Sequence, residues 1–219
     1  MKVAVIGATG RTGQAMLAEL LKRGYDVSVL VRDPAKLGDT ADKVQVVQGS
    51  STDRSAMRQL VAGTDAALSA LGPTSKEPDP HTRTAKLLVE LLPAHGRFIG
   101  VSGAGIDVPG DQKGPRDKVI SFLIRKLGGS VVKDKPAEYE VFAASDLDWT
   151  LVRPPRLMDG QATGKIVHDA HKPGRSSSIQ RADLGQFLVT VLDEGCTSGR
   201  RRSSPAAELR PLLSCSNHL

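Results

Sequence analysis

Three regularly spaced glycines form the first candidate site of the chain. Gly7, Gly10 and Gly13 lie in the stretch GATGRTG, directly behind the short apolar run KVAVI. Glycines between a strand and a helix either make a tight turn or leave room for a ligand, because they carry no side chain. At such a turn, backbone N–H groups can approach a diphosphate, and the following helix N-terminus favours its negative charge. The spacing predicts a dinucleotide-binding turn, with a purely structural turn as the alternative.

A basic residue ends the next apolar run, VSVLV. Arg32 follows the second predicted strand, where NAD-specific dinucleotide-binding domains place an acid that accepts from the ribose hydroxyls. A guanidinium instead forms charge-assisted hydrogen bonds with a 2′-phosphate, and Lys36 can add a second positive charge. These residues predict NADP (NADPH) as the cofactor. The alternative is that Arg32 is an ordinary solvated strand end.

The histidines and cysteines form no recognisable motif. His81, His168 and His171 lack the mutual spacing of metal ligands and are expected in loops. Cys196 and Cys215 show neither Cys-x-x-Cys nor Cys/His spacing. The sequence therefore predicts no metal site and no disulfide framework.

Short β-branched runs alternate with helical patterns along the chain, and this alternation defines the fold. Strands are predicted at 2–6, 26–32, 43–49, 65–71, 97–103 and 148–154, with a further short strand at 164–169. Helices are predicted at 11–24, 54–62 (capped by Asp53), 82–92, 116–127, 136–145 and 182–194. Such alternation produces parallel strands joined by right-handed crossovers. The prediction is an α/β fold with a doubly wound parallel sheet of the Rossmann type.

Length and composition favour a single domain. The 219 residues are 39% hydrophobic and 25% charged, as in an ordinary globular protein. Residues 1–194 are predicted to form an NAD(P)-binding domain, whose small substrate-covering part spans about 104–180. The basic Ser/Arg-rich tail, 195–219, is expected to be flexible, since its apolar residues follow no period.

Charge and hydropathy narrow the choice of partners. Much of the net charge of +6 comes from arginines in the tail, so a solvated end is favoured over a nucleic-acid surface. No apolar run approaches the ~20 residues that span a bilayer, and no signal peptide precedes the first strand. We therefore expect a cytoplasmic monomer or homodimer that acts on a small molecule, without nucleic-acid or membrane partners.

Four stretches resemble one family. GATGRTG is similar to the glycine motif of atypical short-chain dehydrogenase/reductases, in particular their NmrA-like and NADH–flavin/biliverdin-IXβ reductase branch. VSVLVRD, VSGAG (101–105) and SDLDWTLVRPPRL (145–157) carry the same resemblance, and the last is the most family-specific. The resemblance covers roughly residues 1–194. The tail has no counterpart, so the closing strand that many members carry there is expected to be absent or replaced.

The resemblance implies a cofactor site at the ends of the predicted strands. The implied residues are Gly7, Thr9, Gly10, Arg11, Thr12, Gly13, Arg32, Lys36, Ser50, Ser69, Ala70, Leu71, Gly72, Ser102 and Pro154. One residue departs from the family pattern. Members often carry an aspartate after the third strand that contacts the adenine amine, whereas here Ser50 follows Gly49.

Ser102, Lys135 and Tyr139 are the predicted catalytic residues. Typical members of the superfamily use a serine together with Tyr-x-x-x-Lys on one helix. Ser102 matches the serine and Lys135 the lysine, but Val131 stands in place of the tyrosine. Tyr139 lies one turn after Lys135, where flavin-reductase relatives can carry a histidine. Its phenol could donate a proton or stack on a planar ring; the alternative is a purely packing role.

These features favour an NADPH-dependent reductase of a flavin, a quinone or a similar planar acceptor, with FMN or FAD as substrate rather than bound cofactor. Hydride transfer to such acceptors requires no strong protein acid. The acceptor is expected between 71–73, 102–105 and 153–157. One alternative is an NmrA-like NADP-sensing regulator without turnover. Another is an isomerase or epimerase, which the incomplete Tyr–Lys pair disfavours.

Overall fold

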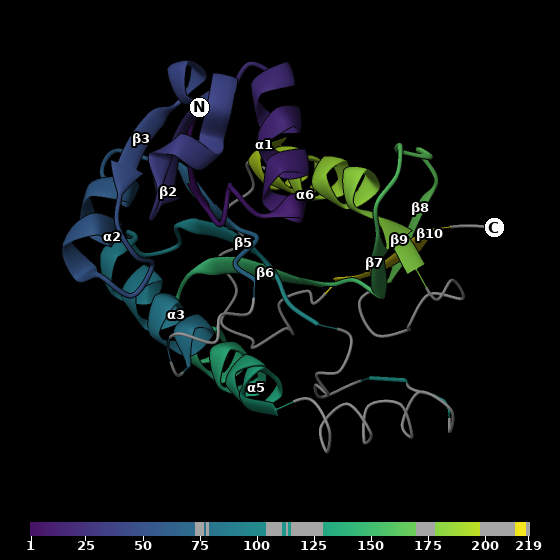
Figure 1. The fold of residues 1–219 in the computed structure, drawn as a ribbon. Helices are drawn as coiled ribbons and strands as arrows, with labels where there is room; N and C mark the ends of the chain where they lie inside the picture. The colour runs from purple at the N-terminus through teal and green to yellow at the C-terminus, as the bar shows by residue number, and fades with distance from the viewer. Residues whose placement is uncertain are drawn as a thin grey trace.

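Six parallel strands form the centre of the fold, in the order β3-β2-β1-β4-β5-β6 (Figure 1). The computed structural model describes residues 1–72, 77, 79–103, 111–112, 114, 129–169, 178–197 and 213–217. The six strands are β1 (Lys2–Ile6), β2 (Asp26–Val31), β3 (Gln45–Gln48), β4 (Ala66–Ser69), β5 (Arg97–Val101) and β6 (Asp148–Arg153). The direction in which the chain adds strands reverses between the neighbouring strands β1 and β4. The predicted doubly wound sheet of the Rossmann type is confirmed.

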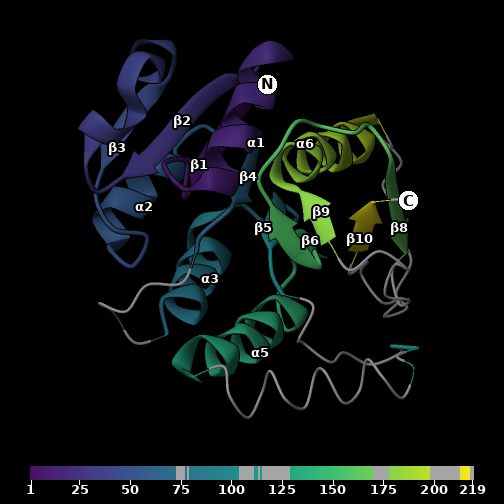
Figure 2. The same cartoon turned by 45° about the vertical axis from the view of Figure 1, so that its right-hand side comes forward.

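Helices cover both faces of this sheet (Figure 2). On one face lie α1 (Arg11–Lys22) and α6 (Arg181–Thr197); on the other lie α2 (Arg54–Val61), α3 (Pro80–Leu91) and α5 (Gly129–Ala143). The 3-10 helix η1 (Pro34–Lys43) joins β2 to β3. As predicted, the Asp53 side chain caps α2 by accepting from the backbone N–H of Ser55 at 2.8 Å. None of the helices in the described part of the chain is long and apolar enough to span a membrane.

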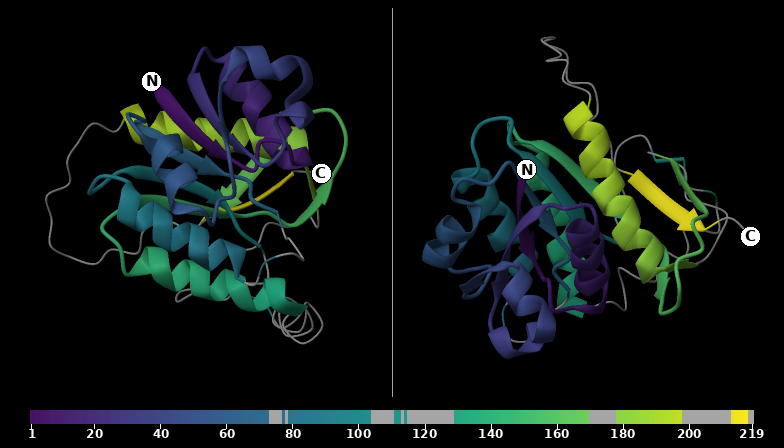
Figure 3. Two further views of the ribbon diagram at one scale, coloured as in Figure 1. Left: turned by 60° about the vertical axis from the view of Figure 1, so that its left-hand side comes forward. Right: turned by 90° about the horizontal axis from the view of Figure 1, so that it is seen from above.

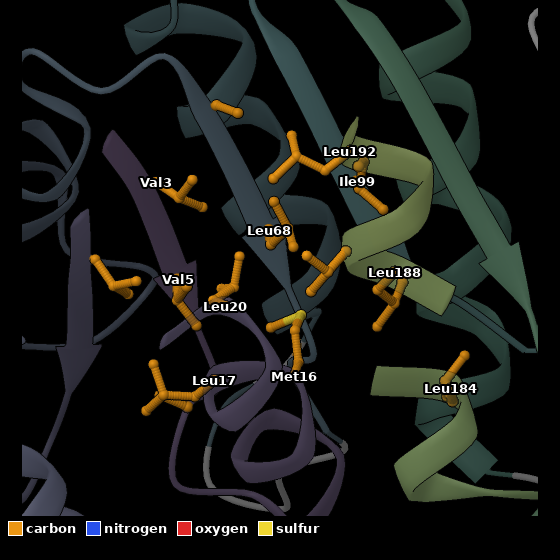
Figure 4. Packing of buried hydrophobic residues seen from close by; sticks show 14 of the residues in the cluster. Val3, Val5, Met16, Leu17, Leu20, Leu68, Ile99, Leu184, Leu188 and Leu192 are labelled. Carbon is orange, nitrogen blue, oxygen red and sulfur yellow. The ribbon is translucent and has the colours of Figure 1, made fainter. Parts of the chain in front are cut away.

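The core has two layers because successive strand residues point to opposite faces of the sheet. In β1, Val3 and Val5 pack with α1 and α6, whereas Ala4 and Ile6 pack with α2, α3 and α5. Figure 4 shows the first layer, where side chains at every fourth position of α6 lie beside those of α1 and the central strands. The residues labelled there are Val3, Val5, Met16, Leu17, Leu20, Leu68, Ile99, Leu184, Leu188 and Leu192.

Helix α5 begins earlier than the predicted 136–145. It starts at Gly129 and includes Pro136 in its interior, although a proline there removes a backbone hydrogen bond. Tertiary contacts of the preceding turn explain this, since Asp134 accepts from the backbone N–H groups of His81 and Thr82 at 2.8 and 2.9 Å. The prediction of a helix at 116–127 lies outside the described residues.

The prediction of a flexible tail without a closing strand is wrong for residues 213–217. Strand β10 (Leu213–Asn217) pairs parallel with β6 and antiparallel with β8 (Ile166–Asp169), which extends the sheet to eight strands (Figure 3). The backbone groups along the edge of β6 can pair with a segment whether or not its apolar residues alternate. The prediction from apolar periodicity therefore missed β10. It also missed the short parallel pair β7 (Arg156–Met158) and β9 (Ser178–Gln180).

Candidate cofactor-binding and active site

A cavity of about 450 Å³ lies at the carboxyl ends of β1 to β4, beside the first turn of α1. Ligands of open α/β sheets bind at this edge, where the strand order reverses. Most of the residues predicted to bind the cofactor line the cavity. They are Gly7, Thr9, Gly10, Arg11, Thr12, Arg32, Lys36, Ser50, Ala70, Leu71 and Gly72.

The three glycines of the turn have different tasks. Gly7 has φ +79°, and a Cβ there would lie 2.7 Å from the Ala70 carbonyl oxygen. A Cβ at Gly13 would lie 1.9 Å from the Gly7 carbonyl oxygen, so this glycine lets α1 pack against the turn. At Gly10 the nearest described atom, again the Gly7 oxygen, is 3.4 Å away, an ordinary contact. Only Gly10 is thus free to keep space for a ligand.

The N-terminus of α1 supplies the electrostatics expected of a phosphate site. Gly10 is the N-cap residue and carries no capping side chain. The first N–H groups of the helix therefore lack an intrahelical acceptor and carry partial positive charge. Because Gly10, Arg11 and Thr12 all line the cavity, a diphosphate bound there can accept from these groups. The residues present fit a dinucleotide.

The opposite end of the cavity carries basic side chains and one acid. Arg32 and Lys36 are exposed and line the wall beside Ser50. Glu77 lines the same wall and accepts from the hydroxyls of Thr52 and Ser50 at 2.5 and 3.2 Å. The Thr52 and Ser50 hydrogen bonds, with the charges of Arg83 and Arg32, hold the pKa of Glu77 below its ordinary value. A positive wall suited to a phosphate thus adjoins a carboxylate.

Sequence reasoning missed Glu77 and Arg181, which both line the cavity. Glu77 follows β4 in a proline-rich stretch, so its position after a strand was its only signal. Arg181 is the first residue of α6, where the helix dipole disfavours a cation. An arginine directly before a predicted helix was therefore a usable sign of an anionic partner.

Four predicted cofactor residues do not line this cavity. Gly13 packs α1 against the turn, as described above. Ser69 is buried, and its hydroxyl accepts from the Leu71 N–H at 3.3 Å, which shapes the loop after β4. Ser102 and Pro154 are also buried, at the ends of β5 and β6. Their roles toward the cofactor stay predictions.

Two of the predicted catalytic residues lie at the end of β5. The Lys135 ammonium donates to the carbonyl oxygen of Val101 at 3.1 Å and to a Glu138 carboxylate oxygen at 2.8 Å. Ser102 follows Val101, and its buried hydroxyl has no hydrogen-bond partner among the described residues. Lys135 is thus held by a carboxylate and positions the strand end from which Ser102 projects.

His81, expected in a loop, is instead a buried residue of α3 with 2% of its surface exposed. Its Nδ1 lies 3.8 Å from the Glu138 carboxylate. Desolvation, together with the charge of Lys135, lowers the pKa of His81 to about 3, so the imidazole is neutral at physiological pH. Burial raises the pKa of Glu138. Of the other two histidines expected in loops, His168 lies in β8 and packs on Phe187 of α6, and His171 lies outside the described residues.

Tyr139 packs within the core between α5 and the sheet. Its ring is half-buried and meets the edge of Trp149 with centroids 5.9 Å apart. Burial raises the pKa of its phenol, so that the hydroxyl stays protonated. These contacts favour the packing role over general acid catalysis.

Arg153 ends β6 and pairs with Asp111, within the part of the chain predicted to cover the substrate. Two guanidinium nitrogens donate to the two carboxylate oxygens at 2.7 and 2.8 Å. Both side chains are buried, with 4% and 7% exposed. Such a two-pronged pair is strongly directional. It ties Asp111 to the end of the sheet.

The glycine turn, the cavity and the strand order define a Rossmann-type nucleotide-binding protein. The chain matches the model of a family described as NAD(P)H-binding over residues 7–195. The protein therefore belongs to this NAD(P)H-binding family. The match also confirms the prediction that the chain binds NAD(P)H.

Individual proteins extend this likeness. YwnB of Bacillus subtilis, which is uncharacterised, is 23% identical over 204 residues, covering 89% of this chain and 92% of YwnB. The structure of ChuY, an anaerobillin reductase of Escherichia coli O157:H7, has a TM-score of 0.74 at 22% identity and covers 99% of this chain and 97% of its own. SP1627 of Streptococcus pneumoniae, a proposed NADH-flavin reductase, has a TM-score of 0.73 at 23% identity and covers both chains completely. These structures share the fold.

Proposed function

We propose that the protein is an NADPH-dependent reductase that transfers hydride to a flavin, a quinone or a similar planar acceptor. The observation that carries the proposal is the cavity itself. It joins an unobstructed glycine turn to a basic wall formed by Arg32 and Lys36. A 2′-phosphate would gain charge-assisted hydrogen bonds from such a wall, which NADH cannot use.

The acceptor class follows from what the catalytic groups can do. The bound cofactor supplies the hydride, and the protein binds and orients the reactants. Lys135 is held by Glu138 and the Val101 carbonyl, and Val131 replaces the usual phenol. Oxidising an unactivated alcohol requires a positioned base, whereas reducing an electron-poor ring does not. These groups therefore suit flavins and quinones better than secondary alcohols.

Two neighbours support a planar acceptor by analogy. ChuY is a reductase of anaerobillin, and SP1627 is a proposed NADH-flavin reductase. We place the acceptor beside the loop after β4, near Leu71 and Leu157, both of which line the cavity. FMN or FAD would act there as substrate rather than as resident cofactor.

The test is a spectrophotometric assay of the purified protein at 340 nm, with NADPH or NADH and a panel of FMN, FAD and quinones. We expect acceptor-dependent oxidation of NADPH in preference to NADH. Tight NADPH binding without turnover of any acceptor would instead support an NADP-sensing regulator. One observation favours that second candidate: the Lys135 ammonium bonds to Glu138 instead of standing free to react.

A further inference from the structure

Three charged side chains meet beside the cofactor cavity. Arg11 is the first residue of α1, Arg181 is the first residue of α6, and Asp159 follows β7. One Asp159 carboxylate oxygen accepts from Arg11 Nη1 at 2.7 Å, and the other accepts from Arg181 Nη1 at 2.5 Å. A single carboxylate thus bridges two guanidinium groups that begin two neighbouring helices.

The arginines belong to the cavity, but the carboxylate does not. Arg11 and Arg181 line the cavity wall, and Asp159 is absent from that wall. Arg11 follows Gly10, in the turn whose N–H groups face a bound diphosphate. Phosphate oxygens accept from arginine as carboxylate oxygens do, through the same charge-assisted bonds. The two arginines therefore form an anion site that this chain fills with its own carboxylate.

We propose that Asp159 is an internal counter-ion of this site, and that the diphosphate of the nicotinamide cofactor replaces it on Arg11 and Arg181. The inference rests on cofactor binding in the cavity, and it does not depend on the acceptor or on the choice between NADP and NAD. It makes Arg181 a cofactor-binding residue and Asp159 a residue that sets the affinity.

The surroundings of Asp159 allow the exchange. Its side chain is 60% exposed, as is much of Arg11, and exposed ion pairs are weak. The next part of the loop is fixed separately, because buried Asp183 accepts from the N–H groups of Thr163 and Gly164 at 2.8 and 2.9 Å. Asp159 can therefore leave the arginines without releasing the loop from α6. Although desolvation opposes it, the hydrogen bonds and charges of Arg181 and Arg11 lower the pKa of Asp159, which keeps the carboxylate charged.

Calorimetric titration of the purified full chain tests the proposal with ADP, NADPH and adenosine 2′-monophosphate. ADP carries the diphosphate without nicotinamide, and adenosine 2′-monophosphate carries no diphosphate. We expect Asp159→Asn to tighten ADP and NADPH binding about two- to tenfold, since it removes the carboxylate that competes for exposed Arg11 and for Arg181, whose side chain is 15% exposed. Adenosine 2′-monophosphate binding should stay unchanged.

Asp148→Asn is the matched control. Asp148 is 59% exposed, pairs with Arg97 at 3.4 Å and begins β6 at the edge opposite the cavity. The substitution makes the same change in net charge and should leave all three dissociation constants unchanged. Arg181→Gln should weaken ADP and NADPH binding about tenfold. In the Arg181→Gln background, Asp159→Asn should lose most of its effect.

The outcomes separate the counter-ion from the cofactor site. Unchanged or weaker ADP binding by a folded Asp159→Asn variant would overturn the exchange, and circular dichroism verifies folding. So would an equal gain in Asp148→Asn, which would reveal a general charge effect. FMN is titrated in the same way. Tighter FMN binding without tighter ADP binding would assign the anion site to an acceptor phosphate and overturn the cofactor assignment. If the unmodified protein binds neither ADP nor NADPH, cofactor binding itself fails.

Discussion

The nucleotide half of the molecule (β1–β3, α1 and η1) and the acceptor half (β5, β6, α3 and α5) hold their functional groups in different ways. In the nucleotide half, Gly7 to Gly10 form the turn that leads into α1, Arg32 directly follows β2, and Lys36 lies in the first turn of η1. In the acceptor half, two polar side chains depend on distant partners. Lys135 reaches Val101 across 34 residues, and Arg153 reaches Asp111 across 42.

This difference sets what each half tolerates. Ligand binding at a local turn depends on the space at one backbone position, Gly10. A substitution there should therefore act on cofactor binding alone. A site built from long-range contacts distributes its effects, because groups such as Glu138 of α5, which lies beside His81 of α3, also take part in the packing of these helices. Substitutions in the acceptor half should therefore change stability before they change chemistry.

The largest effect is expected at Gly10. Gly10→Val should abolish NADPH binding, by more than about a thousandfold, because its methyl groups would occupy the space the diphosphate needs. The backbone at Gly10 is extended, with φ −76° and ψ 157°, which valine adopts readily. Calorimetry measures the affinity, and thermal unfolding measures the fold. Full NADPH affinity in a folded Gly10→Val protein would contradict the cavity as the nucleotide site.

Gly13→Ala is the contrasting variant of the same turn. Its Cβ would overlap the Gly7 carbonyl oxygen, so this change should destabilise the fold instead of acting on the ligand. The pair of variants separates steric exclusion of cofactor from steric damage to the turn.

At Arg32 we expect a smaller but selective effect. Arg32→Ala removes hydrogen bonds to a charged group, worth about 1.5–3 kcal/mol, so NADPH affinity should fall about 10- to 100-fold. NADH lacks the 2′-phosphate, and its affinity should barely change. The ratio of the NADPH and NADH dissociation constants, measured by calorimetry, shows whether Arg32 binds the 2′-phosphate. Arg32→Asp should go further, by repelling NADPH and offering the NADH ribose an acceptor.

Arg58→Ala serves as the control for net charge. Arg58 is an exposed residue of α2 that does not line the cavity, and its loss should leave the ratio unchanged. Equal weakening of both cofactors by Arg32→Ala, or an unmodified protein that prefers NADH, would show that Arg32 is an ordinary strand end.

The same contrast explains which features the sequence could reveal. The turn at Gly7 to Gly13, the cap at Asp53 and the stripe of leucines on α6 are local patterns, and the structure contains them all. The early start of α5 and the strand β10 arise from contacts with distant segments, and no local period encodes them. Buried His81 belongs to this second group, because its burial depends on α5.

A stability effect is expected from His81. Its pKa is about 3 in the folded protein and about 6.5 when unfolded, so the unfolded state gains the proton first as pH falls. Stability from this group is complete above pH 6.5 and is lost as pH falls from 6.5 toward 3. Linkage gives a loss of about 2 kcal/mol between pH 7 and 5. Denaturant unfolding at several pH values measures it.

Glu138 acts in the opposite direction, since its raised pKa lets the folded state take up a proton first. The comparison is therefore made between the unmodified protein and His81→Gln, which cannot titrate at this position. Subtracting the two profiles leaves the contribution of His81. Parallel profiles over pH 5 to 7 would mean that His81 is not a buried neutral group.

The smallest effect is expected at Tyr139. This residue tests most directly whether the acceptor half supplies a catalytic group of its own. If its phenol were a general acid, Tyr139→Phe would lower turnover about 10²–10⁴-fold. The ring instead lies against Trp149 within the α5 layer, and phenylalanine keeps that contact. We expect turnover of NADPH with FMN or a quinone to change less than about tenfold.

Tyr25→Phe is the control, because the other tyrosine bonds to Asp193 on the α1 and α6 face, away from the acceptor half. A thousandfold loss confined to Tyr139→Phe, with unchanged NADPH affinity and thermal midpoint, would show that the acceptor half delivers a proton after all. A small effect at both tyrosines leaves hydride transfer to depend on how the cofactor is held, which is the task of the nucleotide half.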